Sequence, residues 1–257
     1  MEDLVLVNQE GKVATVTINR PKQLNALNGD TIAALSITMQ ELEENESVRA
    51  IILTGSGEKS FVAGADIKEF ANYSVEEGKA LARRGHETLF NLIENLRTPV
   101  IAAVNGFALG GGLELAMSCH MRVASDNARM GLPEVTLGVI PGYGGTQRLA
   151  QLVGKGKAME MITTAGMIDA NDALKWGLVN HVVALDELHA KCAEIASKIA
   201  KNSGVAIAAA MSAVNAGFET GVNGFEAEID AFGEAFGTDE FKEGTTAFLE
   251  KRKPDFK

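Results

Sequence analysis

The sequence predicts an α/β protein whose C-terminal part is entirely helical. Strand-like runs occur four times in the first half of the chain, as KVATVTIN, VRAIILTG, PVIAAVNG and MRVAS. Segments with helical spacing and acid-rich ends separate the first three runs, at residues 28–46 and 74–96. Because strands that alternate with helices need right-handed crossovers, the residues alone predict one largely parallel sheet.

The four runs differ in pattern. KVATVTIN alternates apolar and polar residues, whereas VRAIILTG and PVIAAVNG are continuous apolar runs that end in turn signals. Continuous apolar runs are typical of strands that are buried on both faces. MRVAS follows PVIAAVNG after a gap long enough for a helix. The sequence therefore predicts a buried sheet with helices on its faces.

The C-terminal part has a different pattern. After about residue 140 the strand signals almost vanish, apart from LVNHVV, and Ala, Glu and Lys at helical spacing dominate. Two final amphipathic segments, GFEAEIDAFGEAFG and DEFKEGTTAFLEKRK, carry Phe225, Phe232, Phe236, Phe241 and Phe248. Such an aromatic stripe belongs either to the protein's own core or, in a helix pair at a chain end, to a contact with another subunit.

Composition narrows the partners that are expected. The 257 residues carry a formal net charge of −10. Nucleic acids and anionic membranes are bound by clustered Lys and Arg, so neither is expected as the main partner. The apolar stretch at residues 100–117 contains Asn105, Glu114 and four glycines, which indicates buried core rather than a membrane span.

The start of the chain and its cysteines predict a location. MEDLVLVNQEGK lacks the basic flank and the apolar core of a signal peptide. The only two cysteines, Cys119 and Cys192, are too few for a disulfide framework, and we expect both to be buried apolar filler. A cytoplasmic protein is therefore predicted.

A glycine run precedes an acid in GFALGGGLELAMSC. If residues 113–118 are helical, then Gly110, Gly111 and Gly112 form the loop and the first turn of that helix. Peptide N–H groups there lack intrahelical partners and lie at the positive end of the helix dipole, so the stretch is suited to hold an oxyanion. Glu114 lies on the same face, although a Glu at this position also simply complements the helix dipole.

Two further stretches share these features. Glu134 follows Pro133 in a turn-rich segment, and the glycine-dense PGYGG after it opens another helix. Glu114 and Glu134 together form a plausible acid/base pair, the alternative being that Glu134 is a surface carboxylate. In SFVAGADIKEF, the small residues before Asp66 follow a buried strand and leave a peptide N–H unobstructed, or else form an ordinary turn that Asp66 caps.

These stretches, in this order and spacing, resemble the crotonase, or enoyl-CoA hydratase/isomerase, family. NRPKQLNALN, FVAGADIKEF, VNGFALGGGLELAMSC, GLPEVTLGVIPGYGGTQRL and TAFLEKRKPDF all look like segments of that family, and the match covers nearly the whole chain. The resemblance implies a crotonase-like spiral of strand-strand-helix repeats over residues 1–195. It also implies a helical trimerisation region over residues 196–257, with homotrimers or homohexamers built from two trimers.

The resemblance also implies the roles of the site residues. The N–H groups of Ala65 and Gly111 match an oxyanion hole that grips the thioester carbonyl. Glu134 matches the acid that passes a proton to or from Cα, and Glu114 matches the one that orients and deprotonates water, with the Gly142 N–H beside that water. Two carboxyl groups this close should titrate as a coupled pair.

Contacts to coenzyme A (CoA) are carried over in the same way. The loop of residues 63–68 is expected along the CoA, with main-chain contacts to adenine from Ala63 and Ile67, and Lys22 near the phosphates. Phe248 and Lys251 match residues that reach the CoA of a neighbouring subunit. The full set of implied CoA-binding residues is Lys22, Ala63, Ala65, Asp66, Ile67, Lys68, Phe248 and Lys251.

Three positions distinguish this chain within the family. Tyr143 stands beside the expected acyl site, where its bulk predicts a preference for acyl groups near four carbons, unless the ring turns outward. His120 stands where Asp is usual, with no role expected in the reaction but a possible effect on a contact to Arg122. Leu132 stands where many hydratases have Gln, so one hydrogen bond to Glu134 is lost.

The resemblance predicts hydration of a short-chain trans-2-enoyl-CoA, from crotonyl-CoA to 3-hydroxybutyryl-CoA, by syn addition of water. Two alternatives are less favoured. The first is an isomerase of the same fold, which normally lacks one of the two acids. The second is an RNA-binding homologue, which would need a basic face. The acyl-CoA is the expected substrate, with no metal and no redox cofactor, since the four histidines show no metal-ligand spacing. Fatty acid oxidation, butyrate formation and storage polymer metabolism all remain open as pathways.

Overall fold

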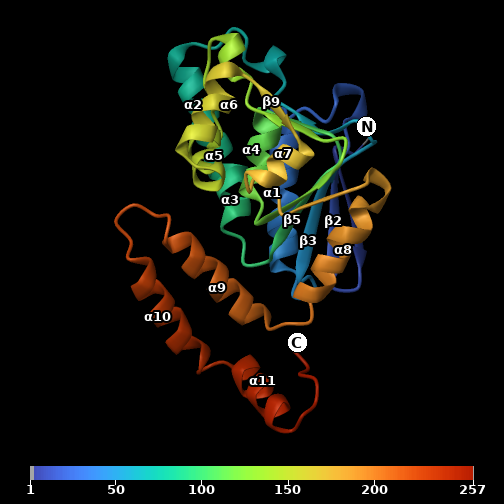
Figure 1. Ribbon diagram of the computed structural model, residues 1–257, viewed down its shortest axis with the longest axis vertical. Coiled ribbons are helices and arrows are strands. Elements are labelled where there is room, and N and C mark those ends of the chain that lie inside the picture. The colour runs from blue at the N-terminus through green and yellow to red at the C-terminus, as the bar shows by residue number, and fades with distance from the viewer. Residues whose placement is uncertain (1–2, 257) are drawn as a thin grey trace.

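The computed structural model describes residues 3–256 and contains two sheets (Figure 1). The six-stranded sheet has the spatial order β1 (Val5–Glu10), β2 (Val13–Ile18), β3 (Ala50–Gly55), β5 (Val100–Val104), β7 (Met121–Ser125) and β10 (His181–Val183). The four-stranded sheet has the order β4 (Ser60–Ala63), β6 (Phe107–Leu109), β8 (Arg129–Gly131) and β9 (Met167–Asp169). Pairing is antiparallel between β1 and β2 and between β8 and β9, and parallel elsewhere.

Successive strands alternate between the two sheets. The pairs β3 and β4, β5 and β6, and β7 and β8 each place their first strand in the larger sheet and their second in the smaller one, before the chain enters a helix. This is the strand-strand-helix spiral that the family resemblance implies. The single parallel sheet expected from the residues alone was wrong, because β6, β8 and β9 have only three residues each and give no periodic signal.

Helices connect and cover the sheets. The α-helices of the spiral are α1 (Gly29–Glu44), α2 (Val75–Gly85), α3 (Asn91–Glu94), α4 (Gly111–Ser118), α5 (Gly145–Val153), α6 (Lys155–Thr164), α7 (Ala170–Lys175) and α8 (Leu188–Ile199). Asn28 caps α1 by accepting the Thr31 N–H at 3.0 Å, and Ser74 and Glu77 form a capping box at α2. The predicted helices over 28–46 and 74–96 are thus confirmed. The second contains a π-helical turn, η3 (His86–Phe90).

The core occupies both faces of the larger sheet. One face packs with α1 and α4 through residues such as Leu35, Leu53 and Leu113. The other face packs against α8, where Ile52 and Ile101 meet Cys192. Both cysteines are free and buried, as expected. The five residues of β5 are all buried, which explains why that strand reads as a continuous apolar run.

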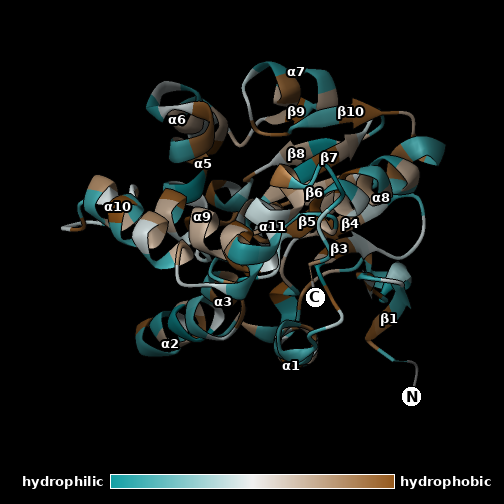
Figure 2. Cartoon of the chain, turned by 90° about the horizontal axis from the view of Figure 1, so that it is seen from below, coloured by the Kyte–Doolittle hydropathy of each residue, from teal (hydrophilic) through white to brown (hydrophobic). Residues whose placement is uncertain are grey.

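The C-terminal helices α9 (Gly204–Ala216), α10 (Gly224–Ala235) and α11 (Asp239–Leu249) extend away from the spiral (Figure 1). The predicted boundary at residues 195/196 falls inside α8, which packs on the sheet, and the extension begins with α9. Hydrophobic positions lie along α9 and α10 (Figure 2), and exposed apolar side chains include Phe218, Phe225, Ile229, Phe232, Phe236 and Phe248. Within this single chain most side chains of the aromatic stripe are therefore exposed rather than buried in a core.

No helix within residues 3–256 is both long and apolar enough to cross a membrane.

Candidate active site

A cavity of about 300 Å³ brings together the three stretches singled out in the sequence. Its walls come from the loop after β4, the N-terminus of α4, the segment after β8 and the side of α2. The lining residues include Ala63, Ala65, Ile67, Gly110, Gly111, Glu114, Glu134, Gly142 and Tyr143. Apolar side chains such as Leu81 and Ile140 complete the walls. A mostly apolar cavity with a few convergent polar groups is the usual form of a small-molecule site.

Two peptide N–H groups at this cavity are unused. No acceptor for the Ala65 N–H or the Gly111 N–H lies within the described part of the chain. The two groups are neighbours, because a Cβ added at Gly111 would stand 3.6 Å from the Ala65 nitrogen. Gly110, just before the helix, has φ +52° and ψ −126°, a conformation that favours glycine. The pair can therefore accept an anionic oxygen without losing a bond within the protein.

Glu114 is held by the glycine-rich loop before α5. The side chain lies in the first turn of α4 and is 1% exposed. Its Oε1 accepts the N–H groups of Tyr143 at 2.7 Å and Gly145 at 2.8 Å. Gly142 lines the same cavity, but the N–H groups that donate to the carboxylate are those of Tyr143 and Gly145. Burial raises the pKa of Glu114 to about 7, while the two N–H groups lower it and Glu134 raises it further.

Glu134 lines the same cavity from the short 3₁₀ helix η4 (Glu134–Leu137). Its Oε1 lies close to Gly110, where an added Cβ would come within 2.8 Å. Its Oε2 is buried with no hydrogen-bond partner among residues 3–256. Burial raises the pKa of this carboxyl above its ordinary value. Glu134 is therefore a partly desolvated acid with a free oxygen, and the alternative of a surface turn carboxylate does not hold.

Tyr143 is turned inward. Its ring is 7% exposed and stacks on Phe90, with centroids 4.6 Å apart and planes 14° from parallel. Gly85, the last residue of α2, makes room for it, because a Cβ there would lie 2.2 Å from the tyrosine Cε1. The ring therefore forms part of the cavity wall. Leu132 is fully buried, so an apolar side chain stands where a hydrogen bond to Glu134 is missing.

Some of the residues expected to bind CoA line the cavity, and the others lie elsewhere on the chain. Ala63 and Ile67 line the cavity, Asp66 is paired with Arg20 at 3.3 Å, and Lys22 and Lys68 are exposed. Phe248 and Lys251, in and just after α11, are exposed and do not line the cavity of their own chain. Figure 1 places α11 at the far end of the molecule from α2. The structure therefore does not bring these two residues together with the loop at 63–68 within one chain.

His120 makes a hydrogen bond between two strands of the larger sheet. Its Nδ1 accepts the Val100 N–H at 2.9 Å, which ties the starts of β5 and β7 together. Burial lowers its pKa to about 4, so the ring is neutral and can accept that bond. Arg122 donates instead to the carbonyls of Leu178, Ala116 and Cys119, and has no hydrogen bond to His120 within the described residues.

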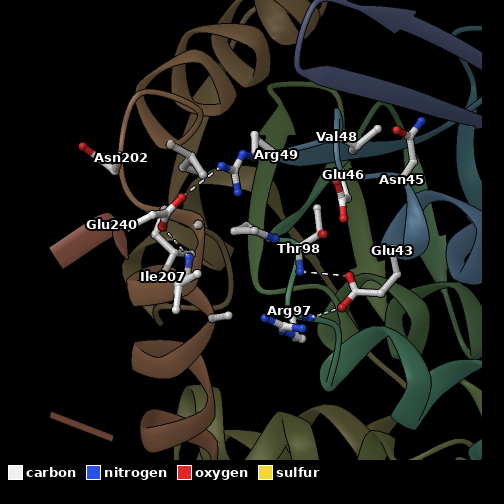
Figure 3. Close-up of a pocket in the computed structure, with 15 residues that line it drawn as sticks. Glu43, Asn45, Glu46, Val48, Arg49, Arg97, Thr98, Asn202, Ile207 and Glu240 are labelled. Atoms are coloured by element: carbon white, nitrogen blue, oxygen red, sulfur yellow. Dashed lines mark hydrogen bonds and ion pairs between the residues drawn. The ribbon is translucent and has the colours of Figure 1, made fainter. Parts of the chain in front are cut away.

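A second cavity, of about 350 Å³, lies between the spiral and the C-terminal extension (Figure 3). Glu43 accepts the peptide N–H groups of Arg97 and Thr98 there, and Arg49 pairs with Glu240 of α11 at 3.2 Å. None of the residues expected at the site lines this cavity. It is one of the places where the extension contacts the spiral, another being the hydrogen bond from Asn215 of α9 to the Glu94 carbonyl at 2.9 Å.

The two-sheet fold and the cavity that contains Glu114 and Glu134 are the features by which this chain can be compared with known proteins. A family model described as enoyl-CoA hydratase/isomerase matches residues 8–257. The chain belongs to the enoyl-CoA hydratase/isomerase family, as the sequence motifs predict.

Individual relatives cover nearly the whole chain. The short-chain-enoyl-CoA hydratase of Clostridium acetobutylicum is 53% identical, over 97% of this chain and 95% of its own length. The crotonyl-CoA hydratase of Syntrophomonas wolfei is 47% identical, over 98% of this chain and 97% of its own. The crystal structure of an enoyl-CoA hydratase from Bacillus anthracis superimposes with a TM-score of 0.93 at 40% identity, covering 99% of both chains.

Proposed function

We propose that this chain is an enoyl-CoA hydratase that adds water reversibly, in the syn sense, to a short-chain trans-2-enoyl-CoA. Crotonyl-CoA is then converted to 3-hydroxybutyryl-CoA. The observation that carries the proposal is one cavity in which the buried carboxyl group of Glu114 and the half-buried one of Glu134 line the same walls as two unused peptide N–H groups. The names of the relatives from C. acetobutylicum and S. wolfei support the same activity and substrate class.

The proposed reaction assigns each group a step. The Ala65 and Gly111 N–H groups bind the thioester oxygen, which gains negative charge as water attacks Cβ. Ionised Glu114 takes a proton from that water while the oxygen bonds to Cβ. Protonated Glu134 gives its proton to Cα. Exchange with solvent then returns Glu114 to the ionised form and Glu134 to the protonated form, so water is the only co-reactant.

To bind an acyl-CoA, the cavity needs an entrance, here called the mouth, and a closed end that receives the acyl group. We assign the mouth to the loop with Ala63, Ala65, Asp66, Ile67 and Lys68, and Lys22 to the phosphates. The closed end is the stacked ring of Tyr143, which supports a preference for short acyl groups. Gly142, next to the loop that holds Glu114, remains the proposed neighbour of the attacking water. No metal or redox cofactor is part of this reaction.

The wider setting is also proposed. The exposed aromatic surface of α9 to α11 supports a homotrimer or a homohexamer, in which Phe248 and Lys251 would serve the CoA of a neighbour. Two free thiols are compatible with a cytoplasmic location. The reaction suits β-oxidation of fatty acids or butyrate metabolism, in either direction.

Two substrates test the activity directly. Wild-type protein is given crotonyl-CoA, whose conjugated absorbance disappears on hydration, and separately a β,γ-enoyl-CoA, whose absorbance appears on isomerisation. We expect rapid loss of absorbance with crotonyl-CoA. An inert response to crotonyl-CoA together with conjugation of the β,γ-enoyl-CoA would replace the hydratase with an isomerase.

A further inference from the structure

Arg148 lies beneath the loop that holds Glu114. It belongs to α5, and its side chain is only 8% exposed. Its Nη1 donates to the Tyr143 carbonyl at 2.9 Å, and its Nη2 donates to Asn91 Oδ1 at 2.9 Å. Its Nε and Nη2 donate to the two oxygens of Glu94, at 3.0 and 2.6 Å. Four hydrogen bonds from one planar guanidinium define its position closely.

This guanidinium is in direct contact with the loop. Gly144 has φ +98°, and a Cβ added there would stand 2.1 Å from Arg148 Nη1. On either side of Gly144, the N–H groups of Tyr143 and Gly145 donate to Glu114 Oε1. Arg148 therefore fixes the carbonyl of the same residue whose N–H binds the carboxylate.

Glu94 and Asn91 hold Arg148 from the other side. Glu94 is the last residue of α3, an end at which the helix dipole disfavours a carboxylate. Its placement there is accounted for by the two-point pair with Arg148, a geometry that adds strength and direction to an ion pair. The pair links α3 to α5 across a separation of 54 residues.

We propose that Arg148, braced by Glu94 and Asn91, is a positioning residue that keeps the Tyr143 and Gly145 N–H groups aimed at the Glu114 carboxylate. The kinetic part of this inference rests on the proposed hydratase function, whereas the state of the Glu114 carboxyl can be measured without any turnover. Among the charged groups that act on Glu114, Glu134 raises its pKa and Arg148 lowers it. The Tyr143 phenol is neutral, since burial raises its pKa to about 12.

The test uses Arg148→Met, Arg148→Lys and the double variant Arg148→Met/Glu94→Leu, which leaves no unpaired carboxylate at position 94. The infrared band of the protonated Glu114 carboxyl, taken as a difference from Glu114→Gln, is followed against pH. We expect the titration of Glu114 to move to higher pH in the Met variants, with Arg148→Lys between them and wild type. On crotonyl-CoA, kcat should fall about a hundredfold while KM changes little, and the acid limb of kcat should move in the same direction.

Arg49→Met is the matched control. It breaks another largely buried ion pair, with Glu240, at the cavity in Figure 3. It should lower the melting temperature without moving the Glu114 titration. If all three Arg148 variants fold and the Glu114 titration stays at the wild-type pH, the proposal is overturned. If wild type lacks hydratase activity but the titration moves as expected, the proposed function fails and the positioning role stands.

Discussion

At the scale of single residues, the environment of Glu114 sets the pH dependence. Its pKa of about 7 means that the group is protonated below that pH and ionised above it. A protonated Glu114 cannot take a proton from water, so we expect kcat for hydration to fall as pH drops through about 7. The pH profile of kcat on crotonyl-CoA measures this. A rate that stays constant down to pH 5 would contradict a raised pKa for Glu114 as the base.

Tyr143 makes a separate prediction at the same scale. Because its ring lines the cavity and stacks on Phe90, we expect that replacing it with Ala opens space for a longer chain. We expect Tyr143→Ala to raise the rate on a ten-carbon enoyl-CoA relative to the four-carbon substrate by about tenfold or more. Tyr143→Phe keeps the ring and should leave the ratio unchanged. Equal ratios in all three proteins would show that this ring does not limit chain length.

At the scale of elements, the start of α4 depends on a close approach of backbones. A Cβ at Gly112 would lie 2.0 Å from the Val62 carbonyl oxygen in β4. Alanine is favoured over glycine in a helix by about 1 kcal/mol, but a clash with a buried backbone costs more. We expect Gly112→Ala to destabilise the fold by about 3 kcal/mol, measured by denaturant unfolding. Gly156→Ala in α6, where nothing lies within 4 Å, is the control and should leave the stability unchanged or raise it by up to about 1 kcal/mol.

The elements also show what the sequence could predict. β3 and β5 are buried runs of six and five residues and are clear from apolarity alone, whereas β6, β8 and β9 are too short to show any pattern. The glycines around them are required by turns or close contacts that only the fold displays. The π-helical turn at His86–Phe90 lies within the segment 74–96, where the sequence predicts only helical spacing.

The same limits apply to the site. The glycine-rich surroundings of Glu114, Glu134 and Ala65 are visible in the sequence itself, and they mark these three residues as candidates. The N–H groups that hold Glu114 belong to the backbone of Tyr143 and Gly145, and peptide donors carry no signature in the sequence. Arg148 stands in the GGTQRL segment, but its partner Glu94 is 54 residues away, a pairing that only folding reveals.

At the scale of the whole molecule, the extension presents more apolar surface than one chain can cover. Phe225, Phe232 and Phe248 are 80%, 67% and 82% exposed. Patches of this kind usually mark contacts between subunits. We expect a trimer or a hexamer by light scattering, and a shift to smaller species for Phe232→Glu. Ile37→Glu, at another exposed apolar residue on α1, should leave the mass unchanged. A monomeric wild type would contradict the proposed assembly.

The most direct test of the account is the hydration rate of crotonyl-CoA by wild type, Glu114→Gln, Glu134→Gln and the double variant, all with matched fold. Because the two carboxyl groups serve the same reaction, each single change should cost about a hundredfold or more, and the double variant should lose much less than the product of the two. Near wild-type rates in either single variant would contradict the assignment of water addition to this pair.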